Sequence, residues 1–336
     1  MQAKPSRTLP ARRRLALGLG LGAAVLVLGW SLAWLLLAQQ LEAGLANWVQ
    51  ARRAEGWQVA HAEPRRGGWP WAAALHLPDV TLADPQGLGW QSAALELRLV
   101  LPLPRRLALE ASGPQAVLVG GARWPGSAGL LRGWVPLVGE GEAELQAEAL
   151  RLEAGPALQR GWLRLQRSAE GTPVLALSLE GMELPGAALP LGPAVERVSL
   201  RAGLVGRLPG AGAVARRAAA WRDDQGRLEL RDATLIWGPL RAEGDATLRL
   251  DQALQPVGQA DLALTGLPET LRALAAAGAL PARSASGLGT MAALMARPGP
   301  NGGPPRLQVP LAVADRRLSL AGFTLLTLPP LAWPAE

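Results

Sequence analysis

The chain has 336 residues, enough for one large domain or two smaller ones, with 49% hydrophobic residues and a net charge of +7. The hydrophobic residues fall in periodic runs, which argues against a disordered chain. Five of the positive charges precede residue 15, and beyond residue 42 acids and arginines are interspersed, so the charge does not indicate a nucleic-acid partner. The sequence has no cysteine, which excludes disulfides, thiolate metal sites and thiol nucleophiles.

A basic tail over residues 1–14 precedes an uncharged apolar run from Leu15 to Ala38. At about 1.5 Å per residue, a helix of this length crosses a hydrocarbon layer of roughly 30 Å. The positive-inside rule keeps the basic tail in the cytoplasm, so we expect a single-pass inner-membrane protein whose main domain is periplasmic. Leu36 stands where a signal peptide cleaved after Ala38 would need a small residue, which favours an uncleaved anchor.

Two motifs near the anchor leave alternatives open. Arg12, Arg13 and Arg14 directly before the apolar run also fit loosely a twin-arginine export signal. Gly18 and Gly22 form a GxxxG pair, a helix-packing motif, so a homodimer through these glycines is one alternative. The same stretch fits a dinucleotide fingerprint, but no strand precedes it and nucleotide binding is not expected.

A juxtamembrane helix is expected over residues 39–56. Leu41, Leu45 and Trp48 follow one another at helical spacing and form a narrow apolar stripe. Gly56 suits the C-cap position. We therefore expect this helix to dock on the domain that follows.

Residues 57–336 are dominated by a period of two. Strict alternation of apolar and polar residues is typical of strands with one buried and one wet face, and Gly and Pro supply turns between them. We expect a mainly β fold of long, curved antiparallel sheet with roughly twelve to sixteen strands and few helices. Among the clearest strands are Ala93–Leu99, Glu148–Glu153, Val174–Leu179, Arg227–Arg231, Ala246–Leu250, Ala260–Leu264 and Arg317–Leu320.

Helix is scarce in this domain. The pattern predicts helices over Pro268–Ala279 and Leu288–Ala296. A lobe boundary, if there is one, is expected near residues 204–212, without two independent domains.

Eight leucines are expected to point to one face of the sheet, because each set is spaced two residues apart. Burying one leucine side chain contributes roughly 1.5–3 kcal/mol, so these side chains cannot all stay bare in water. Either protein or an apolar ligand must cover them. They are Leu228, Leu230, Leu248, Leu250, Leu262, Leu264, Leu318 and Leu320.

No residue set indicates an enzyme, a cofactor or a metal site. His61 and His76 are the only histidines, and we interpret them as ordinary sheet residues rather than ligands with Asp79. Ser127 lies in an imperfect nucleophile elbow without a later histidine to serve it. Asp223 and its neighbour Asp224 precede Gln225-Gly226 and predict a turn.

The segment Gly67–Trp71 (Gly-Gly-Trp-Pro-Trp) is the most distinctive in the chain. We interpret it as a glycine-permitted bend that leads into a strand, with its tryptophans packed in the core rather than on a ligand.

The chain resembles the DUF2125 family, uncharacterised bacterial proteins found mainly in alphaproteobacteria. The resemblance rests on the N-terminal apolar helix and on short segments: Glu55-Gly56-Trp57, Gly67–Trp71, Leu77–Val80, Trp90, Leu235–Leu240 and Gly322–Leu326. A looser resemblance to the AsmA-like group of anchored envelope proteins implies a link to lipid movement and outer-membrane assembly. Neither resemblance implies catalytic residues.

Two functions follow as hypotheses. The first is an envelope protein that shelters or transfers lipid, or another apolar ligand, on a leucine-lined sheet face. The second is a non-catalytic scaffold that buries this face on itself and binds other envelope proteins. A groove open along its length favours the first, and a closed sandwich favours the second.

Overall fold

The computed structural model describes all residues except 1–10, 138–140, 168–171, 187–188, 208–212, 299–303, 321–322 and 334–336. The described residues form seventeen strands and four helices. The helices are α1 (Ala11–Ala54), α2 (Val214–Asp223), α3 (Leu267–Ala276) and α4 (Ala282–Met295). The predicted anchor and juxtamembrane helix are therefore parts of one uninterrupted helix, which ends at Ala54. Gly56 follows in the turn after it with a positive φ of 85°, as expected for a glycine that terminates a helix.

The first half of the chain contributes β1 (Gln58–Ala60), β2 (Arg65–Gly67), β3 (Ala72–Ala83), β4 (Gly89–Val100), β5 (Arg106–Val119), β6 (Ala122–Ser127), β7 (Leu130–Pro136), β8 (Ala143–Leu152) and β9 (Ala157–Arg167). The second half contributes β10 (Pro173–Glu183), β11 (Ala194–Val205), β12 (Arg227–Trp237), β13 (Leu240–Leu250), β14 (Pro256–Thr265), β15 (Leu307–Ala314), β16 (Arg317–Leu320) and β17 (Phe323–Thr327).

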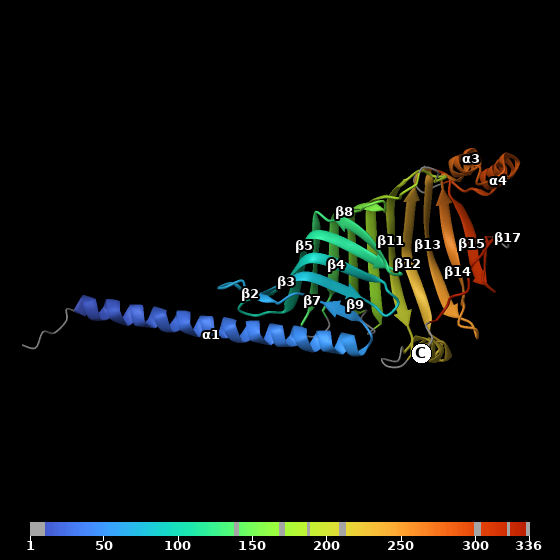
Figure 1. Cartoon of the computed structure of the whole chain (residues 1–336). Helices are drawn as coiled ribbons and strands as arrows, with labels where there is room; N and C mark the ends of the chain where they lie inside the picture. The colour runs from blue at the N-terminus through green and yellow to red at the C-terminus, as the bar shows by residue number, and fades with distance from the viewer. Residues whose placement is uncertain are drawn as a thin grey trace, which may run out of the picture.

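All these strands belong to one antiparallel sheet in which almost every strand pairs with the next one in the sequence (Figure 1). Two positions are shared by a pair of short strands. Strands β1 and β2 both pair with β3, and β6 and β7 both lie between β5 and β8. The predicted mainly β, antiparallel fold is confirmed.

The strands on either side of the segment 204–212, in which a lobe boundary is expected if there is one, pair with each other. Strands β11 and β12 flank this segment and pair from Val195 with Trp237 to Val205 with Arg227. Residues 208–212 themselves lie outside the described part of the chain.

The strand registers place apolar side chains in continuous rows across the sheet. One row crosses twelve strands from β3 to β15 without interruption, and none of its members is polar. It consists of Leu77, Leu95, Ala111, Leu131, Ala147, Gly161, Leu179, Val198, Leu235, Ala242, Leu264 and Leu307. At about 4.8 Å between neighbouring strands, the row is about 50 Å long. We call the face that carries it the apolar face.

Helix α1 covers the first end of the apolar face. Its residues Leu41 and Leu45 pack against Leu75, Leu77 and neighbouring side chains of β3 to β5. Closer to the N-terminus, Ala38 packs against Ala73 and Leu99. The N-terminal part of α1 projects away from the sheet (Figure 1). Leu75 is 0% exposed, so this end is a true hydrophobic core.

Helix α4 covers the other end. Its Ala292 packs with Leu264, Leu307 and Val309, and α3 contributes Leu267 at the edge of the same cluster. The helices predicted in this region are confirmed, although α4 begins six residues earlier than the predicted Leu288. Helix α2 was not predicted, because it buries only Ala218 and Trp221 and its apolar stripe is too narrow to stand out.

The Gly67–Trp71 segment differs from the prediction in one respect. Its bend is present, since Gly68 has a φ of 89° and accepts hydrogen bonds from the amides of Trp71 and Ala72. The tryptophans, however, are not core residues: Trp69 is 53% exposed and Trp71 is 77% exposed. Both precede β3, which begins at Ala72, so their side chains project beyond the end of the sheet instead of onto its buried face.

Candidate functional site: an uncovered apolar groove

The middle of the apolar face has no helix over it among the described residues. The twelve-strand row is buried at its ends, where Leu77 is 2% exposed and Leu264 and Leu307 are each 9% exposed. Every member between Leu95 and Ala242 is half-buried, although neighbouring strands flank it on both sides. We call the stretch from Leu131 to Leu235, across β7 to β12, the apolar groove.

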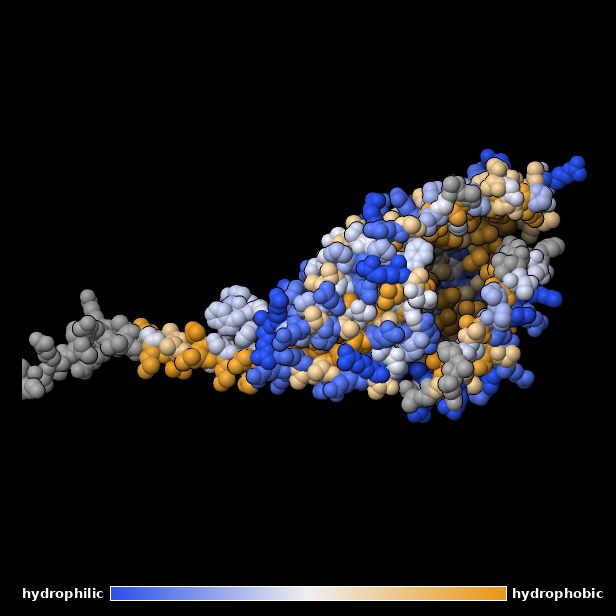
Figure 2. Space-filling view, in the orientation of Figure 1, coloured by the Kyte–Doolittle hydropathy of each residue, from blue (hydrophilic) through white to orange (hydrophobic). Residues whose placement is uncertain are grey.

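The sheet is curved, and its hollow side is seen near the C-terminal strands (Figure 1 and Figure 2). Figure 2 shows a hollow with hydrophobic walls on the side of the C-terminal strands, with polar residues over the outer surface. The lip of the groove along one end of β7 to β9 is the most open part. There Val135, Leu145 and Leu165, which the register places on the apolar face, are 45%, 46% and 49% exposed.

The strand registers place seven of the eight predicted leucines on one face. Leu228 pairs directly with Leu248, and the same cross-strand row continues through Gly258 and Val313 to Leu318. Leu264 is buried beneath α4, whereas Leu228, Leu230, Leu248, Leu250, Leu262 and Leu318 are half-buried. Leu320 pairs with Leu311, but its side chain lies outside the described residues. Whether these residues contact a ligand stays a prediction.

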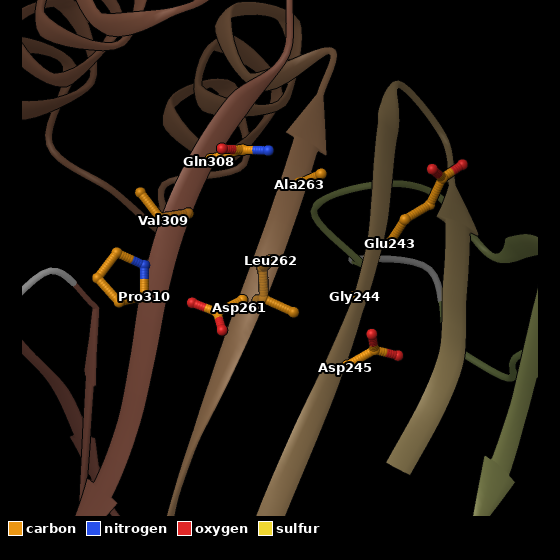
Figure 3. Close-up of a pocket in the computed structure, with 9 residues that line it drawn as sticks. All are labelled: Glu243, Gly244, Asp245, Asp261, Leu262, Ala263, Gln308, Val309 and Pro310. Atoms are coloured by element: carbon orange, nitrogen blue, oxygen red, sulfur yellow. The ribbon is translucent and has the colours of Figure 1, made fainter.

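A shallow cavity of about 430 Å³ is lined by residues of β13, β14 and β15 (Figure 3). Asp245 and Asp261 face each other across two of these strands. The carboxylate of Asp245 accepts a hydrogen bond from the backbone amide of Asp232 at 2.9 Å. Glu243 forms ion pairs with Arg306 and Arg241 at 3.6 and 3.9 Å. We interpret these contacts as structural, because the Asp245 hydrogen bond joins β13 to β12 and the Arg306 ion pair ties the start of β15 to β13 across β14.

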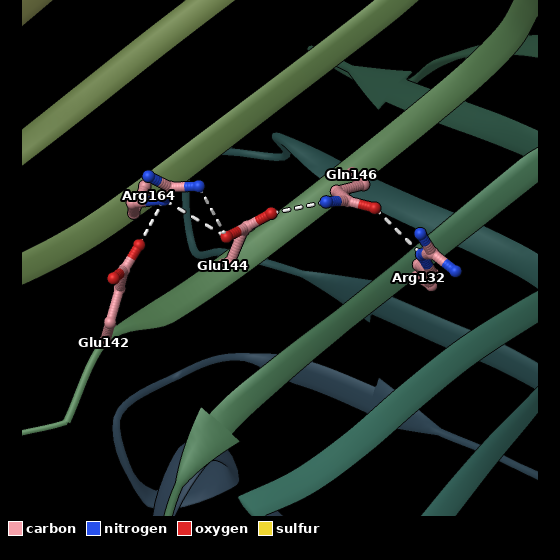
Figure 4. A network of polar contacts seen from close by, with 5 residues as sticks. All are labelled: Arg132, Glu142, Glu144, Gln146 and Arg164. Carbon is pink, nitrogen blue, oxygen red and sulfur yellow. Dashed lines mark hydrogen bonds and ion pairs between the residues drawn. The ribbon is translucent and has the colours of Figure 1, made fainter.

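The outer face carries a polar ladder instead of apolar rows. Figure 4 shows Arg132 donating to Gln146, Gln146 donating to Glu144, and Arg164 bridging Glu144 and Glu142. The guanidinium of Arg164 also lies 5.0 Å from the ring of Trp162. This network spans β7, β8 and β9 on the side opposite the groove. The outer surface of these strands is therefore polar, and the inner face is the apolar one.

A similar cluster on β12 affects a titratable group. Hydrogen bonds from Arg227 and Arg231 lower the pKa of Glu229 below its usual value. Because the pKa is depressed, any stability from this cluster is present at neutral pH and is lost as the pH falls through the folded-state pKa. The side chain is 25% exposed, so the contribution is small.

The described residues offer no metal cluster of three or more His, Asp or Glu side chains. His61 bonds with its neighbouring carbonyl of Ala62, and His76 lies exposed on β3 opposite Glu96. Asp224 caps the end of α2 and accepts a hydrogen bond from the amide of Arg207. The predicted turn is present at Asp224 and Gln225, whereas Asp223 is the last residue of α2.

Helix α1 links the groove to an apolar segment that is long enough to cross a membrane. Within the helical region from Leu19 onward, the most apolar stretch of 18 residues has a mean hydropathy of 2.2, and only 6% of that stretch is buried. Two tryptophans fix this helix to the sheet: the indole N–H of Trp30 donates to the carbonyl of Pro70 at 2.8 Å, and that of Trp34 donates to Ala72 at 2.7 Å. The predicted docking of residues 39–56 is confirmed by the packing of Leu41 and Leu45, although the sequence did not indicate which strands α1 covers.

Fold and site together define a class: a single-sheet protein with one apolar face and an N-terminal helix of membrane-spanning length. Residues 34–329 match the model of a family described as "Uncharacterized protein conserved in bacteria (DUF2125)". The chain belongs to the DUF2125 family. No curated protein and no solved structure matches it.

Proposed function

We propose that this protein is anchored in the bacterial inner membrane and shelters or transfers lipid, or another apolar ligand, along the apolar groove. The observation that carries the proposal is the unbroken twelve-strand apolar row, buried at both ends and uncovered between them. Apolar surface of this extent gains roughly 25 cal/mol for each Å² that is removed from water. An acyl chain laid along the row would supply that cover, and its polar headgroup would stay at the open side.

The position of the groove supports a lipid as the apolar ligand. The groove begins beside the strands that α1 covers, and α1 continues without a break into the apolar segment that starts at Leu19. A lipid that leaves the bilayer alongside α1 therefore meets apolar surface on its whole path to β12. Large exposed apolar patches on proteins commonly mark sites for ligands, partners or membranes.

The test is the lipid content of the full-length protein. Purified in a mild detergent and examined by native mass spectrometry, the protein should carry bound phospholipid in a defined stoichiometry. Lipid extraction and chromatography of the same sample should identify it. A lipid-free protein with a stable fold would overturn the lipid proposal and favour the scaffold, in which another envelope protein covers the groove.

The orientation can be tested separately. We propose that the basic tail is cytoplasmic and that the sheet is periplasmic, because the uncompensated positive charges precede the apolar run. An alkaline phosphatase fused after the C-terminus should be active in a strain with normal export. The same fusion made to a variant in which Arg12, Arg13 and Arg14 are replaced by Glu should lose activity. An inactive fusion to the unmodified chain would contradict the proposed orientation.

A further inference from the structure

Exposed apolar residues gather at the end of the sheet where α1 leaves it. Trp69 and Trp71 of the β2–β3 turn are 53% and 77% exposed. Val100 and Leu103, in and after β4, are 59% and 75% exposed. The two segments are neighbours, because the amide of Leu101 donates a hydrogen bond to the carbonyl of Trp71 at 2.9 Å.

The patch formed by Trp69, Trp71, Val100 and Leu103 lies at a defined position along the axis of α1. The indole of Trp30 donates to Pro70 in the same turn, and the indole of Trp34 donates to Ala72 directly after it. Counted from Leu15, residues 30 and 34 lie about 22 and 28 Å along the helix at 1.5 Å per residue. A hydrocarbon layer is roughly 30 Å thick, so the turn lies at the level where the helix emerges from it.

The charges beside the patch have one sign. Arg65 and Arg66 precede the turn, and Arg105 and Arg106 follow Leu103; all four are exposed. No acidic residue occurs in the sequence between residues 64 and 75 or between residues 97 and 109. Arg66 is paired with Glu42 of α1 at 2.7 Å, which adds another link between helix and sheet. Tryptophan at the headgroup level with arginine beside it is the usual composition of a membrane interface.

We propose that Trp69, Trp71, Val100 and Leu103 form a membrane seat that inserts into the interface of the bilayer, with Arg65, Arg105 and Arg106 on anionic headgroups. The seat is a second contact besides α1, and it holds the open lip of the groove against the lipid surface. Exposed apolar residues continue along the same end of the sheet through Val135 and Leu137, 45% and 46% exposed. This inference rests on the membrane anchoring in the proposed function, but it does not require that lipid enters the groove.

Because the chain has no cysteine, a single cysteine introduced at a chosen position can be labelled specifically. Full-length Leu103→Cys is labelled with an environment-sensitive fluorophore and reconstituted into liposomes of phosphatidylethanolamine and phosphatidylglycerol. The matched control is Leu88→Cys, 57% exposed in the β3–β4 connection at the opposite end of the sheet. Leu26→Cys in α1, 75% exposed, reports insertion of the anchor.

Nitroxide-labelled lipids with the quencher near the headgroup should quench the Leu103 probe several-fold more than the Leu88 probe. Lipids with the quencher deep in the chain should quench the Leu26 probe most. Equal, weak quenching at Leu103 and Leu88 would overturn the seat, whether or not Leu26 is quenched. Bound lipid measured on the same protein separates the two proposals: lipid without Leu103 quenching removes only the seat, and Leu103 quenching without bound lipid removes only the groove function.

A charge variant completes the test. Arg105→Glu combined with Arg106→Glu should reduce the Leu103 signal in these anionic liposomes, because like charges then face the headgroups. Both side chains are exposed, so folding should not change. Unchanged quenching in this variant would overturn the assignment of these arginines to anionic headgroups.

Discussion

Placing two carboxylates on the apolar face should strip lipid from the protein while leaving it folded. The variant carries Leu165→Asp on β9 and Leu248→Asp on β13. Leu165 is 49% exposed and Leu248 is half-buried, so neither supports a closed core. A carboxylate beneath an acyl chain costs about 3 kcal/mol or more, which lowers lipid occupancy about a hundredfold. Native mass spectrometry should show the loss, and thermal unfolding should remain cooperative.

The matched control is Gln166→Asp combined with Gln259→Asp. These residues adjoin the same region, carry the same change of charge and lie exposed on the opposite face of β9 and β14. The control should keep its lipid. Loss of lipid from both double variants would show that charge alone, and not its place on the apolar face, releases the ligand. Unfolding of only the leucine variant, with no lipid in the unmodified protein, would identify the face as an ordinary core.

Truncation of one leucine under α1 should cost far more stability than truncation of one in the groove. Leu75→Ala removes a side chain that is 0% exposed and packed within the cluster that includes Leu41 and Leu45. We expect a loss of about 2–5 kcal/mol in the free energy of unfolding, because the rigid surroundings leave a cavity. Urea denaturation in detergent, followed by tryptophan fluorescence, measures it.

Leu145→Ala provides the comparison on the same face. Leu145 is 46% exposed over the uncovered stretch, so less contact is lost and no closed cavity forms. The loss in the free energy of unfolding should stay below about 1.5 kcal/mol. Full burial of a leucine side chain contributes roughly 1.5–3 kcal/mol, and Leu145 is only about half buried. Equal losses at Leu75 and Leu145 would mean that the middle of the sheet is packed as tightly as its α1-covered end.

The alternation of apolar and polar residues was sufficient to predict the mainly β fold and the common face of Leu228, Leu248 and Leu262. Alternation has a period of two within a single strand, so it can be recognised in the sequence without knowing which strands pair with it. It does not reveal how a face is covered. The covering of the face depends on where α1, α3 and α4 pack. The narrow apolar stripe of Leu41 and Leu45 does not indicate which strands these two leucines contact.

Some elements were missed for local reasons. Strands β6 and β7 carry Pro125 and Gly133, which interrupt the alternating pattern, and β2 and β17 are too short to show a period. The exposure of Trp69 and Trp71 was predicted wrongly, because a tryptophan beside a strand usually packs in a core. Both tryptophans lie in the turn between β2 and β3, beyond the end of the sheet, and this position depends on the tertiary structure and cannot be inferred from composition.

The sequential pairing of neighbouring strands bears on how the chain acquires its structure. Each strand from β8 to β17 pairs with the strand directly before it. Most of these pairings close short loops and carry little entropic cost, whereas β11–β12 and β14–β15 are joined by longer connections that contain α2 and the pair α3 and α4. A chain that emerges N-terminus first can therefore add hairpins one at a time onto an edge already held by α1. When strands pair in this order, no C-terminal strand depends on a partner that is formed later. The growing edge of the sheet is always the strand that was added last.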